Sequence, residues 1–261
     1  MIDYSATSTH SETFVPETDE KPIYAQECIQ DMSRVDILTP IHKGIRSMIY
    51  KLGTEIQTAD FTDEDATKAL VERLEHNLSI ATSRCILCLL HEHAGNENDH
   101  LFPKVRAFEP GMVEMLIQEH REVGHKLVGI SEICAELIAT KDPYKRIEIG
   151  MKLNRSANEL FANYMTHLNK EEVTILPATW QHLTDEQLLE IRAIAEANMP
   201  PERYADWMRW VLPSLNVNEL VAMFTGIKKD APPQVLEKMV DIAGATVNEE
   251  RWKVVRMKVG L

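Results

Sequence analysis

A short motif that occurs twice in the chain limits most strongly what this sequence can fold into. Residues 93–103 (HAGNENDHLFP) and 167–177 (HLNKEEVTILP) each consist of a histidine, three residues, a glutamate, and later a large apolar residue followed by proline. Each copy also follows an earlier histidine in the preceding helical stretch, His42 for the first copy and His120 for the second. The repetition predicts that one helical hairpin is used twice.

The spacing of apolar residues predicts an all-α protein: an up-down-up-down four-helix bundle followed by additional C-terminal helices. Short connections between long helices make consecutive helices antiparallel, which gives this topology. The first bundle helix is expected to start at Thr39, which serves as its N-cap and is followed by Pro40 in the first turn. The second is expected to start near Thr62 and to end before Pro103. The third is expected to start after Pro110-Gly111, and the fourth to run from near Asp142-Pro143 to Pro177.

Three segments follow from the same pattern. Residues 1–25 lack hydrophobic periodicity and are expected to form a flexible, acidic N-terminal arm. Residues 26–178 hold the bundle. Residues 179–261 are expected to form a helical extension packed on or beside it, in which Thr184 and Gln187 fit a capping box.

The repeated motif has a chemical meaning. Residues four apart on a helix lie on one face, about 5–6 Å apart at their Cβ atoms, so the histidine and glutamate of each copy can point at the same place. Glutamates are rarely buried unless they are paired or bind a metal, and two divalent ions bridged by two carboxylates would neutralise the charge. A nitrogen and oxygen ligand set suits iron or manganese, with zinc possible. The predicted metal ligands are His42, His93, Glu97, His120, His167 and Glu171.

At these positions the sequence resembles the hemerythrin-like, or HHE cation-binding, family. That family has a lone histidine, an H-x3-E motif, a histidine often preceded by glutamate (here Glu119-His120), and a second H-x3-E motif. The resemblance covers about residues 35–178. It implies a non-heme centre of two iron ions, bridged by carboxylates and an oxo or hydroxo group, that can meet dioxygen, peroxide or nitric oxide.

One position departs from the oxygen-carrying members of that family. They have a further histidine four residues beyond the third-helix ligand, where this chain has Gly124. We therefore expect metals that are more open to external ligands, and a protein that senses or handles iron, dioxygen, peroxide or nitric oxide. The alternatives are a di-iron enzyme that reduces peroxide or nitric oxide or activates dioxygen, and a helical interaction module with a structural metal. The sequence does not decide whether the chain is an enzyme.

Several residue assignments stay open at this point. Glu172 competes with Glu171, since some hemerythrins use a carboxylate five residues after the histidine. Tyr164 lies one turn before His167 and could form a hydrogen bond near the centre or simply fill the core. His100 shares a helix face with the first motif and could support its ligands.

A ferritin-like arrangement is a rival interpretation, because Glu97-x-x-His100 and Glu122-x-x-His125 both fit the E-x-x-H pattern. These motifs would lie on consecutive helices, however, and the other two helices would each need an inward glutamate. This interpretation is therefore the weaker one.

Charge and hydropathy restrict the partners and the location. The formal net charge is −13, which argues against nucleic acid or an anionic membrane surface as a partner. The N-terminal residues do not resemble a secretory signal, and no stretch approaches the roughly 20 apolar residues of a membrane span. We therefore expect a cytoplasmic protein that binds a small ligand; a protein partner could bind through the C-terminal helices, and the oligomeric state is open.

Overall fold

The structure is a computed structural model that describes residues 34–75, 86–197 and 199–261. Contacts within the chain divide it into residues Met1–Arg34 and a compact unit of Val35–Leu261. The predicted arm, residues 1–25, lies outside the described residues. The described residues form helices and no strand, and none of their helices is long and apolar enough to cross a membrane.

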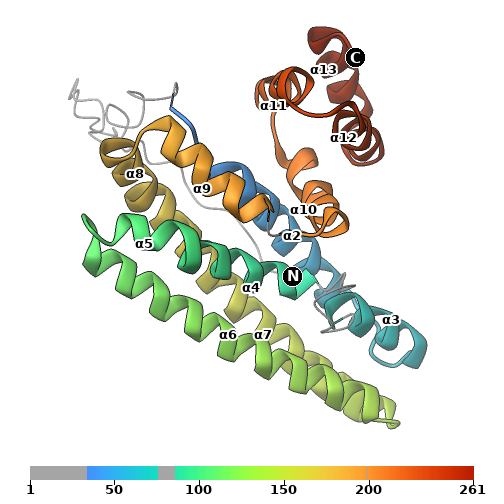
Figure 1. The fold of residues 1–261 in the computed structure, drawn as a ribbon. Coiled ribbons are helices and arrows are strands. Elements are labelled where there is room, and N and C mark those ends of the chain that lie inside the picture. Colours follow the sequence, from blue (N-terminus) through green and yellow to red (C-terminus); the bar gives the residue numbers. More distant parts are fainter. Residues whose placement is uncertain (1–33, 76–85, 198) are drawn as a thin grey trace, which may run out of the picture. The chain divides into compact units, whose positions relative to one another are not determined.

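The bundle is built from long helices that pack side by side (Figure 1), as the sequence predicted. Helix α6 packs along α7, which also packs against α2, while α4 contacts α6. The segment between α3 and α4 lies outside the described residues. The bounds of these helices are Thr39–Gln57 (α2), Glu64–Glu75 (α3), Ile86–Asn96 (α4), Pro110–Ala139 (α6) and Pro143–Lys170 (α7).

The prediction that Pro103 and Pro177 end their helices was wrong. After α4 and α7 the chain makes one π-helical segment and then continues as α-helix through each proline. The last π-type hydrogen bond of the first segment runs from the N–H of Phe102 to the carbonyl of Glu97. The next residue is Pro103, which has no N–H and so cannot continue the π pattern, although its fixed φ suits the first turn of a new α-helix. The segments are Glu97–Leu101 (η1), Phe102–Val105 (α5), Glu171–Ile175 (η2) and Leu176–His182 (α8).

Two predicted helix starts had different outcomes. Thr39 is the first helical residue of α2, not its N-cap; the carboxylate of Asp36 accepts hydrogen bonds from the N–H groups of Leu38 and Thr39. The capping box is confirmed: the N–H of Gln187 donates to Thr184 Oγ1 and the N–H of Thr184 donates to Gln187 Oε1. In both cases a side-chain oxygen satisfies amide groups that the helix leaves unpaired.

The C-terminal helices follow the bundle, and α10 packs against α2 and α12. The approach of α10 to α2 is close at Gly44, where an added Cβ would lie 3.0 Å from Val211 Cγ2 and 3.2 Å from the Val211 backbone. A larger residue at Gly44 would force the helices apart. These helices are Asp185–Ala197 (α9), Pro201–Ser214 (α10), Val217–Asp230 (α11), Pro233–Thr246 (α12) and Glu249–Val259 (α13).

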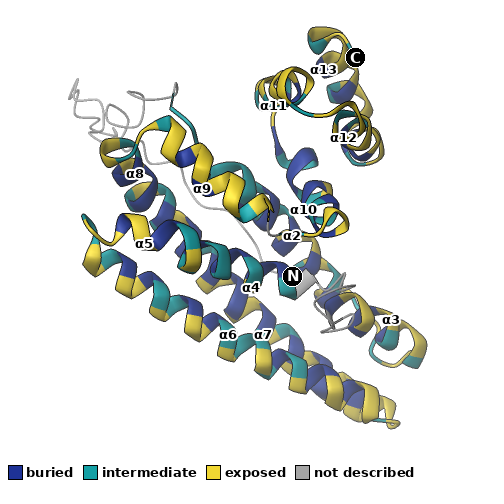
Figure 2. Cartoon of the chain, viewed as in Figure 1, coloured by how far each residue is buried: buried dark blue, intermediate teal, exposed yellow. Residues whose placement is uncertain are grey.

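Buried residues are dark blue in Figure 2, and the apolar ones among them form two clusters. The larger one, the main core, includes Ile45, Leu90, Val123, Leu160 and Tyr164. The smaller one, the end cluster, consists of Leu38, Leu101, Phe102, Val105, Val113, Leu116, Ile175, Leu176 and Ile191. Along the bundle helices the predicted metal ligands lie between main-core residues on one side and end-cluster residues on the other.

Candidate metal centre

The structure brings all six predicted ligands together inside the bundle. Helices α2, α4, α6 and α7 each contribute a histidine, and each π-helical segment begins with a glutamate. The side chains are buried between the two apolar clusters. Relative exposures are 0% for His42, 6% for His93, 4% for Glu97, 6% for His120, 1% for His167 and 0% for Glu171.

Their nitrogen and oxygen atoms fall into two groups, each with its atoms within 4.8 Å of one another. Each group contains two histidines, and both groups contain the same two glutamates. The histidine pairs are His42 with His93, from the first hairpin, and His120 with His167, from the second.

Glu97 directs one carboxylate oxygen toward each histidine pair. Its Oε1 lies 3.2 Å from His93 Nε2 and 3.8 Å from His42 Nε2, while its Oε2 lies 3.4 Å from His120 Nε2. Ligands at about 2.0–2.2 Å from one ion are themselves about 3 Å apart or slightly more. The distances around Glu97 are therefore those of ligand atoms that can share an ion.

Glu171 has the matching arrangement. Its Oε1 lies 3.1 Å from His167 Nε2 and its Oε2 lies 3.5 Å from His42 Nε2. The two carboxylates therefore span the same two histidine pairs, one from each copy of the motif.

The buried acceptor atoms of the six-residue group have too few hydrogen-bond donors around them. Both oxygens of Glu97, both oxygens of Glu171 and the Nε2 atoms of His42 and His93 have no hydrogen-bond partner among the described residues. Leaving such atoms unsatisfied in the interior costs free energy, and buried carboxylates cost most. Cations coordinated by these atoms would remove that cost, so the residues present fit a metal centre.

Three of the histidine rings are held in place by residues outside the six, through hydrogen bonds at their Nδ1 atoms. His42 Nδ1 lies 2.9 Å from Glu172 Oε1, and His167 Nδ1 lies 2.9 Å from Glu119 Oε2. Because an ionised carboxylate can only accept, Nδ1 carries the proton in both rings, and the lone pair of a neutral ring is then on Nε2, facing the group. His120 Nδ1 is held in the same way, 2.9 Å from Asn98 Oδ1.

His120 and His167 also face each other, with 2.9 Å between their Nε2 atoms. Two neutral rings that both carry the proton on Nδ1 would direct lone pairs at each other across this distance. A cation coordinated by both Nε2 atoms would remove the repulsion, so this contact also fits metal binding.

The electrostatics of the protein groups alone show the same excess of negative charge. Burial on its own would lower the pKa of His42, but its contacts with Glu172, Glu97 and Glu171 outweigh burial and raise the pKa to about 9. Burial also acts to lower the pKa of His167, yet the nearby carboxylates, Glu171 first, raise it to about 9. Positive charge is therefore strongly favoured in this region.

A model of the protein family described as the hemerythrin HHE cation-binding domain matches residues 33–179. This chain belongs to that family. The match contains all six residues and ends before α9, so helices α9 to α13 lie outside the hemerythrin domain. No curated protein and no solved structure matches the chain.

Within the hemerythrin domain the geometry separates the residues that the sequence left open. Glu171 lies in both ligand groups, whereas Glu172 accepts hydrogen bonds from His42 Nδ1 and Arg46. Tyr164 is a core residue whose hydroxyl donates to the carbonyl of Leu90.

The ferritin-like alternative does not fit this domain, because Glu122 and His125 are both exposed on α6. His100 is half-buried and lines a cavity beside His93, but it belongs to neither ligand group.

Sequence reasoning missed the outer residues of the hemerythrin domain. The sequence pattern gave no role to Asn98 and included Glu119 only as part of the family motif, although both residues orient histidines of the site. Glu119 also pairs with Lys170, as Glu172 pairs with Arg46, so the outer carboxylates are partly neutralised. A usable signal was present: Glu119 and Asn98 directly adjoin His120 and Glu97 in the sequence.

Proposed function

We propose that the chain holds two metal ions, iron first and manganese or zinc as alternatives, and uses them to sense or handle iron, dioxygen, peroxide or nitric oxide. The observation that carries the proposal is that each buried glutamate directs its two oxygens at two different histidine pairs. A single ion would need only one of those pairs. Two divalent ions would also more than offset the charge of the two carboxylates and draw on every buried acceptor at the site.

The protein residues prepare this site in three ways. The outer acceptors Glu172, Asn98 and Glu119 fix the rotation and the proton position of the imidazoles, which orients ligands before any ion binds. Phe102 stacks on His120 at a ring distance of 5.5 Å, and the apolar clusters on both sides limit access of water. Iron bound there would supply redox chemistry toward small oxygen or nitrogen species.

A sensing role is supported by the residues that adjoin the ligands. Lys43 and Gly44 directly follow His42 on α2; Lys43 pairs with Glu219 of α11 and Gly44 packs against Val211 of α10. A shift of α2 that accompanies a change at the centre would therefore act directly on the C-terminal helices.

An enzymatic role is the second candidate, and Gly124 favours it. A Cβ added at Gly124 would meet no heavy atom within 4 Å, so the position at which oxygen carriers have an additional histidine is open next to the helix backbone here. With two imidazoles and two shared carboxylates, each ion would have four protein ligands, and a six-coordinate ion would retain open positions. Turnover of peroxide or nitric oxide above that of free iron would support this candidate.

Metal analysis of the purified chain, with optical spectra before and after exposure to dioxygen and nitric oxide, tests the main proposal. We expect two ions per chain in the wild type. His120→Gln and Glu171→Gln should lower the metal content, whereas His125→Gln, on the exposed face of the same helix as His120, should leave it unchanged. A wild-type chain that holds no iron or manganese after reconstitution would contradict the proposal.

A further inference from the structure

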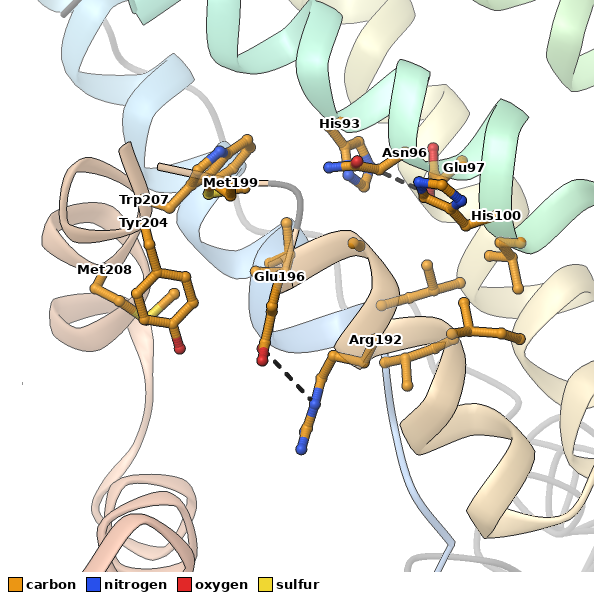
Figure 3. Close-up of a pocket in the computed structure, with 16 residues that line it drawn as sticks. His93, Asn96, Glu97, His100, Arg192, Glu196, Met199, Tyr204, Trp207 and Met208 are labelled. Atoms are coloured by element: carbon orange, nitrogen blue, oxygen red, sulfur yellow. Dashed lines mark ion pairs between the residues drawn. The ribbon is translucent and has the colours of Figure 1, made fainter. Parts of the chain in front are cut away.

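A cavity of about 130 Å³ lies beside the candidate metal centre, between the bundle and helices α9 and α10. Figure 3 shows His93 and Glu97 on one side of it and Tyr204, Trp207 and Met208 on the other. The cavity is partly open to solvent. It is therefore a pocket that a molecule can enter.

Most of the pocket surface is apolar. Leu101 contributes from the bundle, Ile191 and Ala195 from α9, and Trp207 and Met208 from α10. Helices α9 and α10 follow residue 179, where the match to the hemerythrin domain ends. The pocket is thus formed jointly by the family domain and by the C-terminal helices of this chain.

The pocket touches one side of the centre. Of the six candidate ligands, His93 and Glu97 line it. His93 belongs only to the group that also contains His42, whereas Glu97 belongs to both groups. A molecule in the pocket would therefore lie against a histidine of one ion position and a carboxylate shared by both.

The charges around the pocket disfavour an anion. Glu97 and Glu196 both line it, and the guanidinium of Arg192 already pairs with Glu196 at 3.7 Å. In the metal-free protein an anionic ligand would meet two carboxylates, and Arg192 already pairs with one of them. An uncharged molecule would lose little on entering.

The size of the cavity sets the scale of the molecule. An apolar cavity of about 150 Å³ accommodates benzene or xenon, because apolar walls hold water poorly. A cavity slightly smaller than this accommodates a molecule no larger than a single small ring.

We propose that this pocket binds a small, uncharged, apolar molecule, at most the size of one aromatic ring, against the His93 and Glu97 side of the centre. Binding itself depends on the pocket alone. The role of the molecule as a ligand or substrate of the metal centre rests on the function proposed above.

Fluorobenzene is a suitable probe, and its binding to the full chain can be followed by ¹⁹F NMR. Ala195→Phe fills the pocket from α9, and Ala193→Phe places the same ring on the exposed face of that helix as a matched control. We expect saturable binding to the wild type and to Ala193→Phe, and a loss of affinity of about tenfold or more in Ala195→Phe. Ala195→Leu, which fills less space, should give an intermediate loss and serves if Ala195→Phe does not fold.

Equal affinity of the wild type and the Ala195 variants would overturn the proposal, as would benzoate binding to the metal-free protein as strongly as fluorobenzene does. The metal measurements keep the two proposals apart. Fluorobenzene binding to a chain that takes up no metal would leave the pocket intact and remove the metal function. Metal uptake without fluorobenzene binding would support the metal function and overturn the pocket proposal.

Discussion

Glu92 of α4 accepts one bifurcated hydrogen bond from the single Nε–H of Arg203 on α10, with its two carboxylate oxygens at 2.8 and 2.9 Å from Nε. Glu92 directly precedes the candidate ligand His93, and Trp207 Nε1 donates to the same carboxylate at 3.2 Å. The C-terminal helices therefore hold a residue next to the centre through a charged contact in which the arginine is buried.

Replacing Arg203 by methionine should destabilise the protein, because it removes charge-assisted hydrogen bonds from a carboxylate that is about two-thirds buried. Since the Glu92 carboxylate remains partly exposed to solvent, we expect the free energy of unfolding to fall by about 1–3 kcal/mol, less than for a fully buried pair. Urea denaturation measures it. Arg209→Met removes a more exposed ion pair with Asp206 on the same helix and should change the free energy by less than about 0.5 kcal/mol. Equal effects of the two variants would contradict this account.

Asn98→Ala should weaken metal binding without removing a candidate ligand. The variant loses the acceptor for His120 Nδ1, so the ring is no longer held in one orientation with its proton on Nδ1. Loss of such an outer partner lowers metal affinity by about 10–100-fold. Competition with a chelator of known affinity measures the change. The neighbouring Asp99 is exposed, and Asp99→Ala should bind metal as the wild type does.

Gly124→Ala and Gly124→His separate helix stability from ligand chemistry. Because Gly124 lies within α6 and a Cβ there meets open space, alanine should stabilise the protein by up to about 1 kcal/mol. Histidine adds an imidazole one turn beyond His120 and should change the optical spectrum of the metal-loaded protein and slow its reaction with nitric oxide. Gly129→His, further along the same helix and also in open space, is the control and should leave the spectrum unchanged.

Chelation should lower the stability of the metal-loaded protein without unfolding it. Binding to the folded state alone contributes about 4 kcal/mol at a ligand concentration 1,000 times the dissociation constant, and a chelator removes that contribution. The main core and the end cluster contain none of the candidate ligands, so the helices should persist. Thermal melts followed by circular dichroism, with and without chelator, measure the shift. Loss of the helical signal at room temperature would instead favour the metal as a structural element.

The fold was predictable because its signals are local. Helical periodicity, Pro143 in the first turn of α7 and the Thr184 capping box all depend on residues within a few positions of one another, although α6 begins at Pro110 itself and not after Gly111 as expected. The helix ends at Pro103 and Pro177 were mispredicted for a related reason. Both π-helical segments begin at a glutamate of the candidate site, and the spacing of apolar residues carries no sign of a π-helical turn.

The repeated motif by itself determined that two histidine and glutamate pairs share helix faces, since the α-helix fixes that geometry within four residues. Only the tertiary structure decided which oxygen of each glutamate faces which histidine pair, and that Glu172 orients a ring while Glu171 joins both ligand groups. It also decided that α9 and α10 form a wall of the pocket beside His93. These relationships join residues from different helices, and packing of the whole chain, not local sequence, sets the distances between them.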